Sequence, residues 1–175
     1  GDLSFALHTI EQNQKKQETE EKLRRANLVV ENSAVVAFRW QAEPEWPVAF
    51  VTDNCERLLG YTARQFTTGQ ITYESLIHPD DIEQVRADVA HYSEQDVEQF
   101  RHEYRLVCRT GEIIWVEDRT TVSRNDQNKI EHYQGLVYDI TERKNAEQKF
   151  LEVHSKLQDA MRVGHLAWWE MNVKT

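Results

Sequence analysis

Residues 100–140 read FRHEYRLVCRTGEIIWVEDRTTVSRNDQNKIEHYQGLVYDI, and this segment determines the class of the fold. Its β-branched and aromatic residues alternate with polar ones, a period of two that is typical of half-buried strands. Thr110-Gly111 and the run from Asn125 to Asn128 interrupt the alternation with residues that favour tight turns. The segment therefore predicts three consecutive antiparallel strands, over 100–109, 112–124 and 129–140.

The residues before this segment predict two further strands and several helices. Residues 35–40 and 48–52 are rich in β-branched and aromatic side chains, and a proline-containing break separates them. Capping and turn residues then mark three helices: 54–59 before Gly60, 62–66 before Gly69, and a longer helix opened by His78-Pro79-Asp80-Asp81 with Ile82, Val85, Val89 and Tyr92 on one face. This order predicts an α+β fold, with one five-stranded antiparallel sheet and helices on one face.

Polar segments flank the predicted domain, residues 32–140, on both sides. Residues 1–31 are dominated by Gln, Glu, Lys and Arg, which predicts a solvated connecting helix. Gly164 is expected to end a second helix over 141–163, and residues 164–175 are expected to form the first strand of a truncated second domain. Apolar residues of the second helix recur at alternating spacings of four and three, as in a coiled coil: Ala146, Phe150, Val153, Leu157 and Ala160.

Composition excludes several classes of protein. The chain has 175 residues and a formal net charge of −9, so it lacks the positive charge with which proteins bind nucleic acid or anionic membranes. No apolar run approaches the roughly 20 residues that span a bilayer, and the chain does not open with a signal peptide. Two cysteines cannot form a disulfide framework. We therefore expect a cytoplasmic module with no nucleic-acid partner and no direct membrane insertion.

Five short motifs, taken in order, resemble a PAS domain with its C-terminal PAC segment. They fall within about residues 27 to 145 and read TDNCERLLGY at 52–61, IHPDD at 77–81, EYRL at 103–106, GEIIWV at 111–116 and YDITERK at 138–144. The resemblance implies a five-stranded sheet with helices over a cavity, in a sensory or dimerisation module of bacterial signalling proteins. Residues 165–175 resemble the opening of a second PAS domain, and residues 1–7 resemble the last helix of a GAF domain.

The resemblance also implies which strand residues face the helices. Strand alternation then gives one inward set as candidates to line a ligand cavity: Tyr104, Leu106, Val116, Asp118, Thr120 and Val137. The outward set needs a cover, from a flanking helix or a second subunit: Trp115, Glu117, Leu136, Tyr138 and Ile140. Signal relay and dimer formation are assigned to the end of the last strand and the following helix: Asp139, Ile140, Thr141, Ala146, Phe150, Val153 and Leu157.

No cofactor or metal is expected, although an unidentified small ligand stays open. Flavin-binding relatives need a cysteine in the segment matching 69–76, where this chain has none, and a glutamine where this chain has Val137. Cys55 and Cys108 are interpreted as small buried apolar residues. His91 is offset from the apolar face of its helix, so it is a poor axial ligand for haem. The remaining histidines lack the spacing of metal ligands.

Three polar groups each have two interpretations. His102 either reaches the cavity rim or is a half-exposed strand residue, and we favour exposure. Asp118 either anchors a ligand or pairs with an arginine or a backbone group, and we favour the pairing because a lone buried charge is costly. His78-Pro79-Asp80-Asp81 is interpreted as helix capping rather than acid–base chemistry, since Asp80 and Glu83 have the spacing of a capping box.

Together, these features predict a non-catalytic PAS sensory and dimerisation module. It would form a homodimer and relay a signal through its C-terminal helix to a downstream output domain of the same polypeptide, a diguanylate cyclase ahead of a histidine kinase. Enzyme activity within the chain is not expected, because it has no phosphate-binding glycine loop and no nucleophile elbow. Two alternatives remain: a small-molecule or haem sensor with an occupied cavity, and a purely structural spacer.

Overall fold

The computed structural model describes residues 15–17, 21 and 32–173, and it describes 163–173 by their backbone alone. The chain divides after Asp139 into two units. The first contains the mixed sheet-and-helix domain, and the second consists of helix α5 (Thr141–Val173). Residues 15–17 and 21 are helical, and the rest of the expected connecting helix over 1–31 lies outside the described residues, as does the expected end of a GAF domain.

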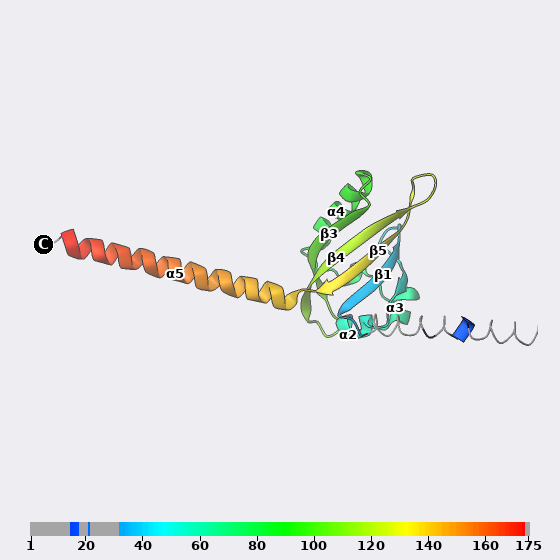
Figure 1. Cartoon of the computed structure of the whole chain (residues 1–175), viewed down its shortest axis with the longest axis horizontal. Helices are drawn as coiled ribbons and strands as arrows, with labels where there is room; N and C mark the ends of the chain where they lie inside the picture. Colours follow the sequence, from blue (N-terminus) through cyan, green and yellow to red (C-terminus); the bar gives the residue numbers. More distant parts are fainter. Residues whose placement is uncertain (1–14, 18–20, 22–31, 174–175) are drawn as a thin grey trace, which may run out of the picture. The chain divides into compact units, whose positions relative to one another are not determined.

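Five strands form one antiparallel sheet in the order β2-β1-β5-β4-β3 (Figure 1). The first strand in the sequence therefore pairs with the last, and Phe38 of β1 lies opposite Gly135 of β5. This confirms the predicted α+β fold. The strands are β1 (Val35–Gln41), β2 (Val48–Val51), β3 (Gln99–Val107), β4 (Ile113–Arg124) and β5 (Ile130–Asp139).

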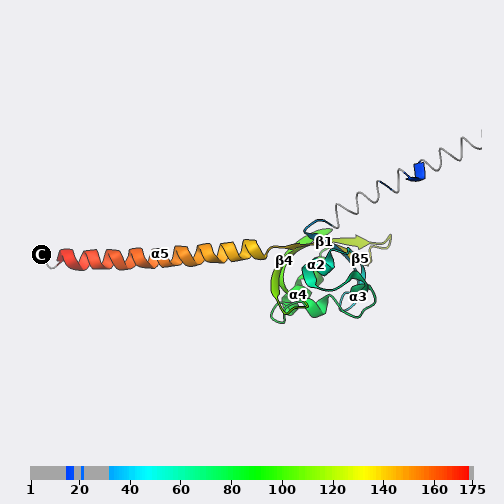
Figure 2. The same ribbon diagram turned by 90° about the horizontal axis from the view of Figure 1, so that it is seen from below.

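Four short helical segments connect β2 to β3 and lie on one side of the sheet (Figure 2). Gly60 ends the first of them at φ 80°, a left-handed conformation that glycine adopts without strain. Thr62 caps the second in a capping box with Gln65. The segments are α2 (Cys55–Leu59), α3 (Ala63–Thr67), the 3₁₀ helix η1 (Glu74–Leu76) and α4 (Ile82–Glu94).

The start of α4 differs from the predicted capping box. The N-cap is Asp81, one residue after the Asp80 that the spacing to Glu83 predicts, and Asp81 makes no side-chain capping bond there. Its carboxylate instead accepts hydrogen bonds from the backbone N, Nε and NH2 of Arg105, at 2.8, 3.0 and 2.5 Å. Charge-assisted bonds to a guanidinium are stronger than a neutral cap bond, so the carboxylate ties α4 to β3.

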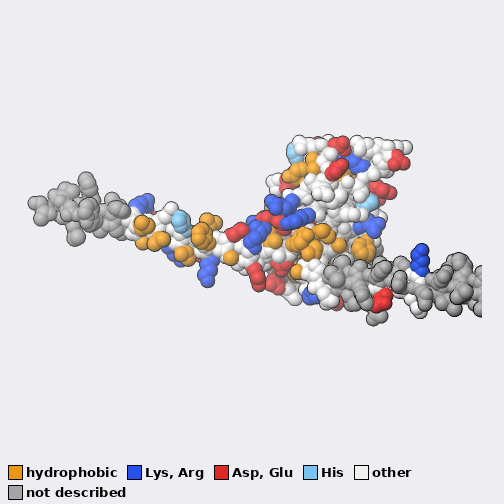
Figure 3. All heavy atoms as spheres, in the orientation of Figure 1, with side chains coloured by type: hydrophobic (Ala, Val, Ile, Leu, Met, Phe, Trp, Pro, Cys, Tyr) orange, Lys and Arg blue, Asp and Glu red, His pale blue; other side chains and the backbone are white. Residues whose placement is uncertain are grey.

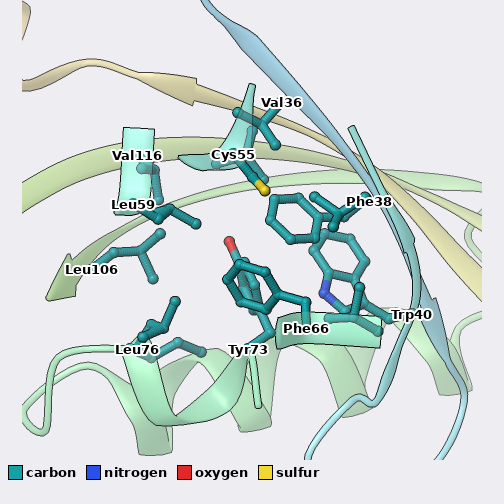
Figure 4. Close-up of a cluster of buried hydrophobic side chains, with 14 of the residues drawn as sticks. Val36, Phe38, Trp40, Cys55, Leu59, Phe66, Tyr73, Leu76, Leu106 and Val116 are labelled. Carbon is teal, nitrogen blue, oxygen red and sulfur yellow. The ribbon is translucent and has the colours of Figure 1, made fainter. Parts of the chain in front are cut away.

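The core fills the space between the sheet and these helices (Figure 4). Phe38 and Trp40 of β1 stack with their ring centroids 5.2 Å apart, and Tyr73 packs edge-on against both rings. Phe66 of α3 completes the aromatic group with an edge contact to Phe38. Aromatic residues from a strand and from the connecting helices thus fix the helices on this face of the sheet.

The opposite face of the sheet is amphipathic, with hydrophobic and basic side chains next to one another (Figure 3). Phe50 and Leu136 are 46% and 43% exposed. The guanidinium of Arg39 lies over the Phe50 ring and that of Arg119 over the Tyr138 ring, at 5.9 and 5.1 Å from the centroids. Long arginine stems can cover apolar surface in this way while their charged ends stay in water.

Helix α5 continues through Gly164, so the strand expected over 164–175 is wrong for its described part, which is helical to Val173. A lone strand would leave its backbone N–H and C=O groups without a ladder partner, whereas a helix pairs them internally. Five described side chains of α5 expose large apolar surfaces: Phe150 at 69%, Leu151 at 66%, Val153 at 59%, Leu157 at 56% and Met161 at 59%.

Candidate functional site

All six inward candidates are buried on the helix side of the sheet. Leu106, Val116 and Val137 are completely buried among core side chains. Tyr104, Asp118 and Thr120 lie together at a cavity between the sheet and the helices. The structure therefore divides the candidates into an apolar group inside the core and a polar group at the cavity.

Asp118 is the centre of the polar group. Its Oδ2 accepts a hydrogen bond from the Tyr104 hydroxyl at 3.0 Å, and its Oδ1 accepts one from the Thr120 hydroxyl at 2.9 Å. The Nε2 atom of His102 lies 3.4 Å from Oδ2. Asp118 is paired, as favoured above, but with two hydroxyls and an imidazole rather than with an arginine. These neighbours offset the free-energy cost of burying the Asp118 carboxylate.

The two tyrosines of the group form a directed chain of hydrogen bonds. Burial raises the pKa of both Tyr73 and Tyr104 well above the usual value, and the nearby Asp118 carboxylate raises it further. Both phenols therefore keep their protons. Because Tyr104 gives its only proton to Asp118, Tyr73 must be the donor in the 2.9 Å bond between the two hydroxyls.

The cavity itself has a volume of about 30 Å³, which is enough for water or a molecule of a few non-hydrogen atoms. Strand β1 contributes Trp40 to the wall, and β3 contributes His102. Trp40 Nε1 and His102 Nδ1 are buried and have no hydrogen-bond partner among the described residues. The remaining lining is mainly apolar and aromatic: Trp46, Tyr73, Ile77, Val85, Val89, Phe100, Tyr104, Asp118, Thr120 and Tyr133.

Gly135 of β5 makes room for two of these groups. A Cβ atom at this position would overlap the six-membered ring of Trp40 and lie 2.8 Å from Asp118 Oδ1. The missing side chain lets the indole and the carboxylate approach the β5 backbone from the helix side. This is a requirement for space rather than for backbone conformation, since Gly135 does not have a positive φ.

The loop between β1 and β2 supplies Trp46 at the cavity. Glu45 and Trp46 both have positive φ, 64° and 47°, a conformation that is unfavourable for residues with a Cβ. The hydrogen bond from Gln41 N to Pro47 O, at 2.9 Å, closes the loop across these two residues. Strained backbone next to a cavity is a frequent feature of binding sites.

His102 is more buried than the sequence analysis favoured. Its side chain is 8% exposed, and its ring packs edge-on between those of Phe100 and Tyr104, at 5.4 and 4.9 Å. The alternation with Tyr104 already placed it on the inner face, and this signal should have outweighed its polarity. Trp40, Tyr73 and Trp46 were missed as cavity residues because no hydrophobic pattern distinguishes the wall of a cavity from the core around it.

The two cysteines are not reactive groups. Cys55 is fully buried, and its burial raises the thiol pKa to about 11. Burial also raises the pKa of Cys108. Each thiol donates to a main-chain carbonyl, of Tyr61 and Leu58 respectively, at 3.4 Å. Both behave as the small buried side chains that the sequence suggests.

The residues assigned to signal relay do not form a cluster. Asp139 is the last residue of β5, and Thr141 is the first residue of α5, with the half-buried Ile140 between them. Ala146, Phe150, Val153 and Leu157 are exposed along α5. Their role in relay and dimer formation stays a prediction.

Residues 48–137 match the family described as PAS fold. This span runs from β2 through most of β5 and includes Tyr104 and Asp118 of the cavity wall. The chain belongs to the PAS-fold family. A PAS domain accounts for the five-stranded sheet, for the helices on one face and for the position of the cavity between them.

Three relatives illustrate the range of proteins that carry this PAS fold. The chain is 40% identical over 157 residues to a methyl sulfide methyltransferase-associated sensor from Methanosarcina acetivorans, and the match covers 90% of this chain but 15% of that protein. A sensory box histidine kinase/response regulator from Burkholderia thailandensis E264 has a TM-score of 0.60 at 22% identity, covering 77% of this chain and 98% of that structure. The N-terminal domain of a diguanylate cyclase with PAS/PAC sensor from Marinobacter aquaeolei has a TM-score of 0.55 at 22% identity, covering 63% and 98%. The two solved structures establish the shared fold.

Within the described part of the chain, no helix is both long enough and apolar enough to cross a membrane. The same residues contain no group of three or more His, Cys, Asp or Glu side chains arranged to hold a metal ion.

Proposed function

We propose that this PAS domain is a non-catalytic sensory and dimerisation module, which relays a signal through α5 to an output domain beyond it in the same polypeptide. The observation that carries the proposal is the direct connection between the cavity wall and the helix. Strand β5 provides Gly135 and Tyr133 next to the cavity, and α5 begins two residues after β5 ends. A change at the cavity can therefore act on β5, the strand that leads into the helix.

The curated relative supports the sensory part of the proposal. It is named as a sensor, and its identity of 40% extends over 157 residues, 90% of this chain. We place the module in the cytoplasm and propose a diguanylate cyclase as its output, ahead of a histidine kinase. These are the outputs named for two proteins that share the fold.

The exposed side chains of α5 support a homodimer. Phe150, Val153 and Leu157 recur at spacings of three and four, and each exposes more than half of its surface. Polar neighbours pair along the helix instead, with Arg143 3.2 Å from Glu147 and Gln148 3.2 Å from Glu152. An apolar stripe bordered by such pairs is typical of a coiled-coil seam. The amphipathic outer face of the sheet would add to the dimer interface.

The test replaces two seam residues of the 175-residue chain. Phe150→Asp with Leu157→Asp should lower the mass measured by light scattering at micromolar protein from that of a dimer toward that of a monomer. Gln148→Asp with Gln158→Asp adds the same charge at exposed positions of α5 outside the seam, and this control should remain dimeric. Equal masses for the two variants, with unchanged circular dichroism, would contradict dimerisation through the seam.

A further inference from the structure

The cavity wall carries one carboxylate and no lysine or arginine among its lining residues. An anionic ligand would meet Asp118 without a compensating positive charge, so the wall disfavours carboxylates and phosphates. Asp118 already accepts hydrogen bonds from Tyr104 and Thr120 and lies near His102, which reduces its need for a cation. The charge pattern of the wall therefore favours an uncharged ligand.

Two residues of the cavity wall, Trp40 and His102, each keep one buried atom without a hydrogen-bond partner among the described residues, and these atoms define what a ligand must do. Trp40 Nε1 carries a hydrogen and can only donate. His102 Nε2 faces a carboxylate oxygen, which accepts, so this nitrogen carries the imidazole proton. In the neutral ring the other nitrogen, Nδ1, is then an acceptor. The wall residues thus supply one unused donor and one unused acceptor, both buried, and burying such atoms without partners is costly.

We propose that the cavity binds a small uncharged molecule which accepts a hydrogen bond from Trp40 Nε1 and donates one to His102 Nδ1, of the class of primary amides and alcohols. The volume of about 30 Å³ restricts the ligand to a few non-hydrogen atoms, and the aromatic wall favours a short apolar tail. This inference rests on the proposed sensory function, because the ligand would be the signal at the same site.

The first test compares four probes on the wild-type chain, each small enough for the cavity: formamide, acetonitrile, formate and ethylammonium. The indole N–H signal of Trp40 in a ¹⁵N-labelled sample is the readout, and Trp40→Phe assigns that signal among the five tryptophans. Formamide should shift the signal saturably at millimolar concentration. Acetonitrile accepts a hydrogen bond but cannot donate one, and it should bind about tenfold more weakly, as the two ions should.

The second test uses two tryptophans that line the same cavity. Trp40→Phe removes the unpartnered N–H while keeping an aromatic ring, and it should weaken formamide binding about tenfold, measured by calorimetry. Trp46→Phe is the matched control, since its indole nitrogen is not among the unpartnered buried atoms, and affinity should change by less than about threefold. Circular dichroism checks that both variants are folded.

The inference is overturned if no probe shifts the Trp40 signal, because water would then be the occupant of the cavity. It is also overturned if formate or acetonitrile binds as well as formamide. These outcomes are distinct from failure of the proposed function, which depends on the α5 dimer and on relay. Probe binding with a monomeric wild-type chain would contradict the relay proposal and leave the ligand inference standing.

Discussion

His102 of β3 and Asp118 of β4 lie directly opposite each other in the sheet, with 3.4 Å between His102 Nε2 and Asp118 Oδ2. Both side chains are nearly buried, at 8% and 5% exposed. Strand register alone therefore brings a titratable pair to the cavity, and the hydroxyls of Tyr104 and Thr120 complete the surroundings of the carboxylate. The polar site depends on the sheet for its geometry, and helices only close it.

Replacing Asp118 tests the importance of this network for stability. Asp118→Asn leaves one acceptor oxygen for donors that now use two, and it adds an NH₂ group facing other donors. We expect a loss of about 1–3 kcal/mol in the free energy of unfolding by urea. Asp126→Asn, in the exposed turn between β4 and β5, is the control and should change the free energy by less than about 0.5 kcal/mol. Equal effects would show that the network is not stabilising.

Two leucines on opposite faces of the sheet test the assignment of those faces. Leu106 is fully buried, whereas Leu136 is 43% exposed. Leu106→Ala should lower the free energy of unfolding by about 2–5 kcal/mol, because it leaves a cavity in the core. Leu136→Ala should cost much less in the same denaturation experiment. A larger loss of stability for Leu136→Ala than for Leu106→Ala would show that the two faces of the sheet are assigned the wrong way round.

The space over Gly135 gives a third prediction. Gly135→Ala should destabilise the domain by about 1–3 kcal/mol, since the new methyl group overlaps the Trp40 ring. Trp40→Phe removes the overlapping atoms, so the double variant should be more stable than the sum of the two single losses predicts. Thermal melts of all four proteins in a double-mutant cycle measure this coupling. Simple additivity would mean that the indole moves aside without cost.

The pairing of Asp81 with Arg105 predicts a pH dependence. Hydrogen bonds from Arg105 hold the pKa of Asp81 below its usual value of 3.8, despite a smaller opposing effect of burial. The stabilisation is therefore present above the unfolded-state pKa and is lost as the pH falls through the lower folded-state pKa. Asp81→Asn should reduce stability near neutral pH, and the difference from wild type should shrink as the pH falls below 3.8 and through the lowered folded-state pKa.

The neighbouring aspartate provides a control for that measurement. Asp80 is 73% exposed, and its Oδ2 lies 3.6 Å from Arg105 NH2 and 3.6 Å from His78 Nδ1, both longer than the bonds of Asp81. Asp80→Asn should show a much smaller difference from wild type at every pH. A difference for Asp81→Asn that does not change with pH would show that its carboxylate contributes through packing rather than charge.

Much of the fold could be predicted from the sequence because local rules and tertiary packing agree along most of it. The period of two in β3 to β5 gave the strands and the inward set, and Gly60 and Thr62 marked helix ends that the structure confirms. Asp81 shows where local rules fail, because a long-range partner on β3 replaces the cap bond. The residues after Gly164 show the same limit, because α5 continues through this glycine to Val173. Glycine permits a helix to end, but the backbone groups that follow then need hydrogen-bond partners outside the helix.

The site was less predictable than the fold. Asp118 stood out because a carboxylate on an inward strand position needs a partner, and the structure supplies three neighbours. Trp40 gave no such signal, since its N–H group looks the same in sequence whether it is bonded or not. Only the three-dimensional packing shows that Trp40 and His102 each keep an unpartnered atom at one cavity.

If α5 carries the signal from the PAS domain, output must depend on the helical phase of α5. In the full-length protein, one residue inserted after Arg143 rotates everything downstream by roughly 100° about the helix axis. Seven inserted residues restore the face to within about 20°. Output activity should change with the single insertion and largely survive the insertion of seven. Equal output from the two proteins would rule out relay through α5 and make this helix a passive tether.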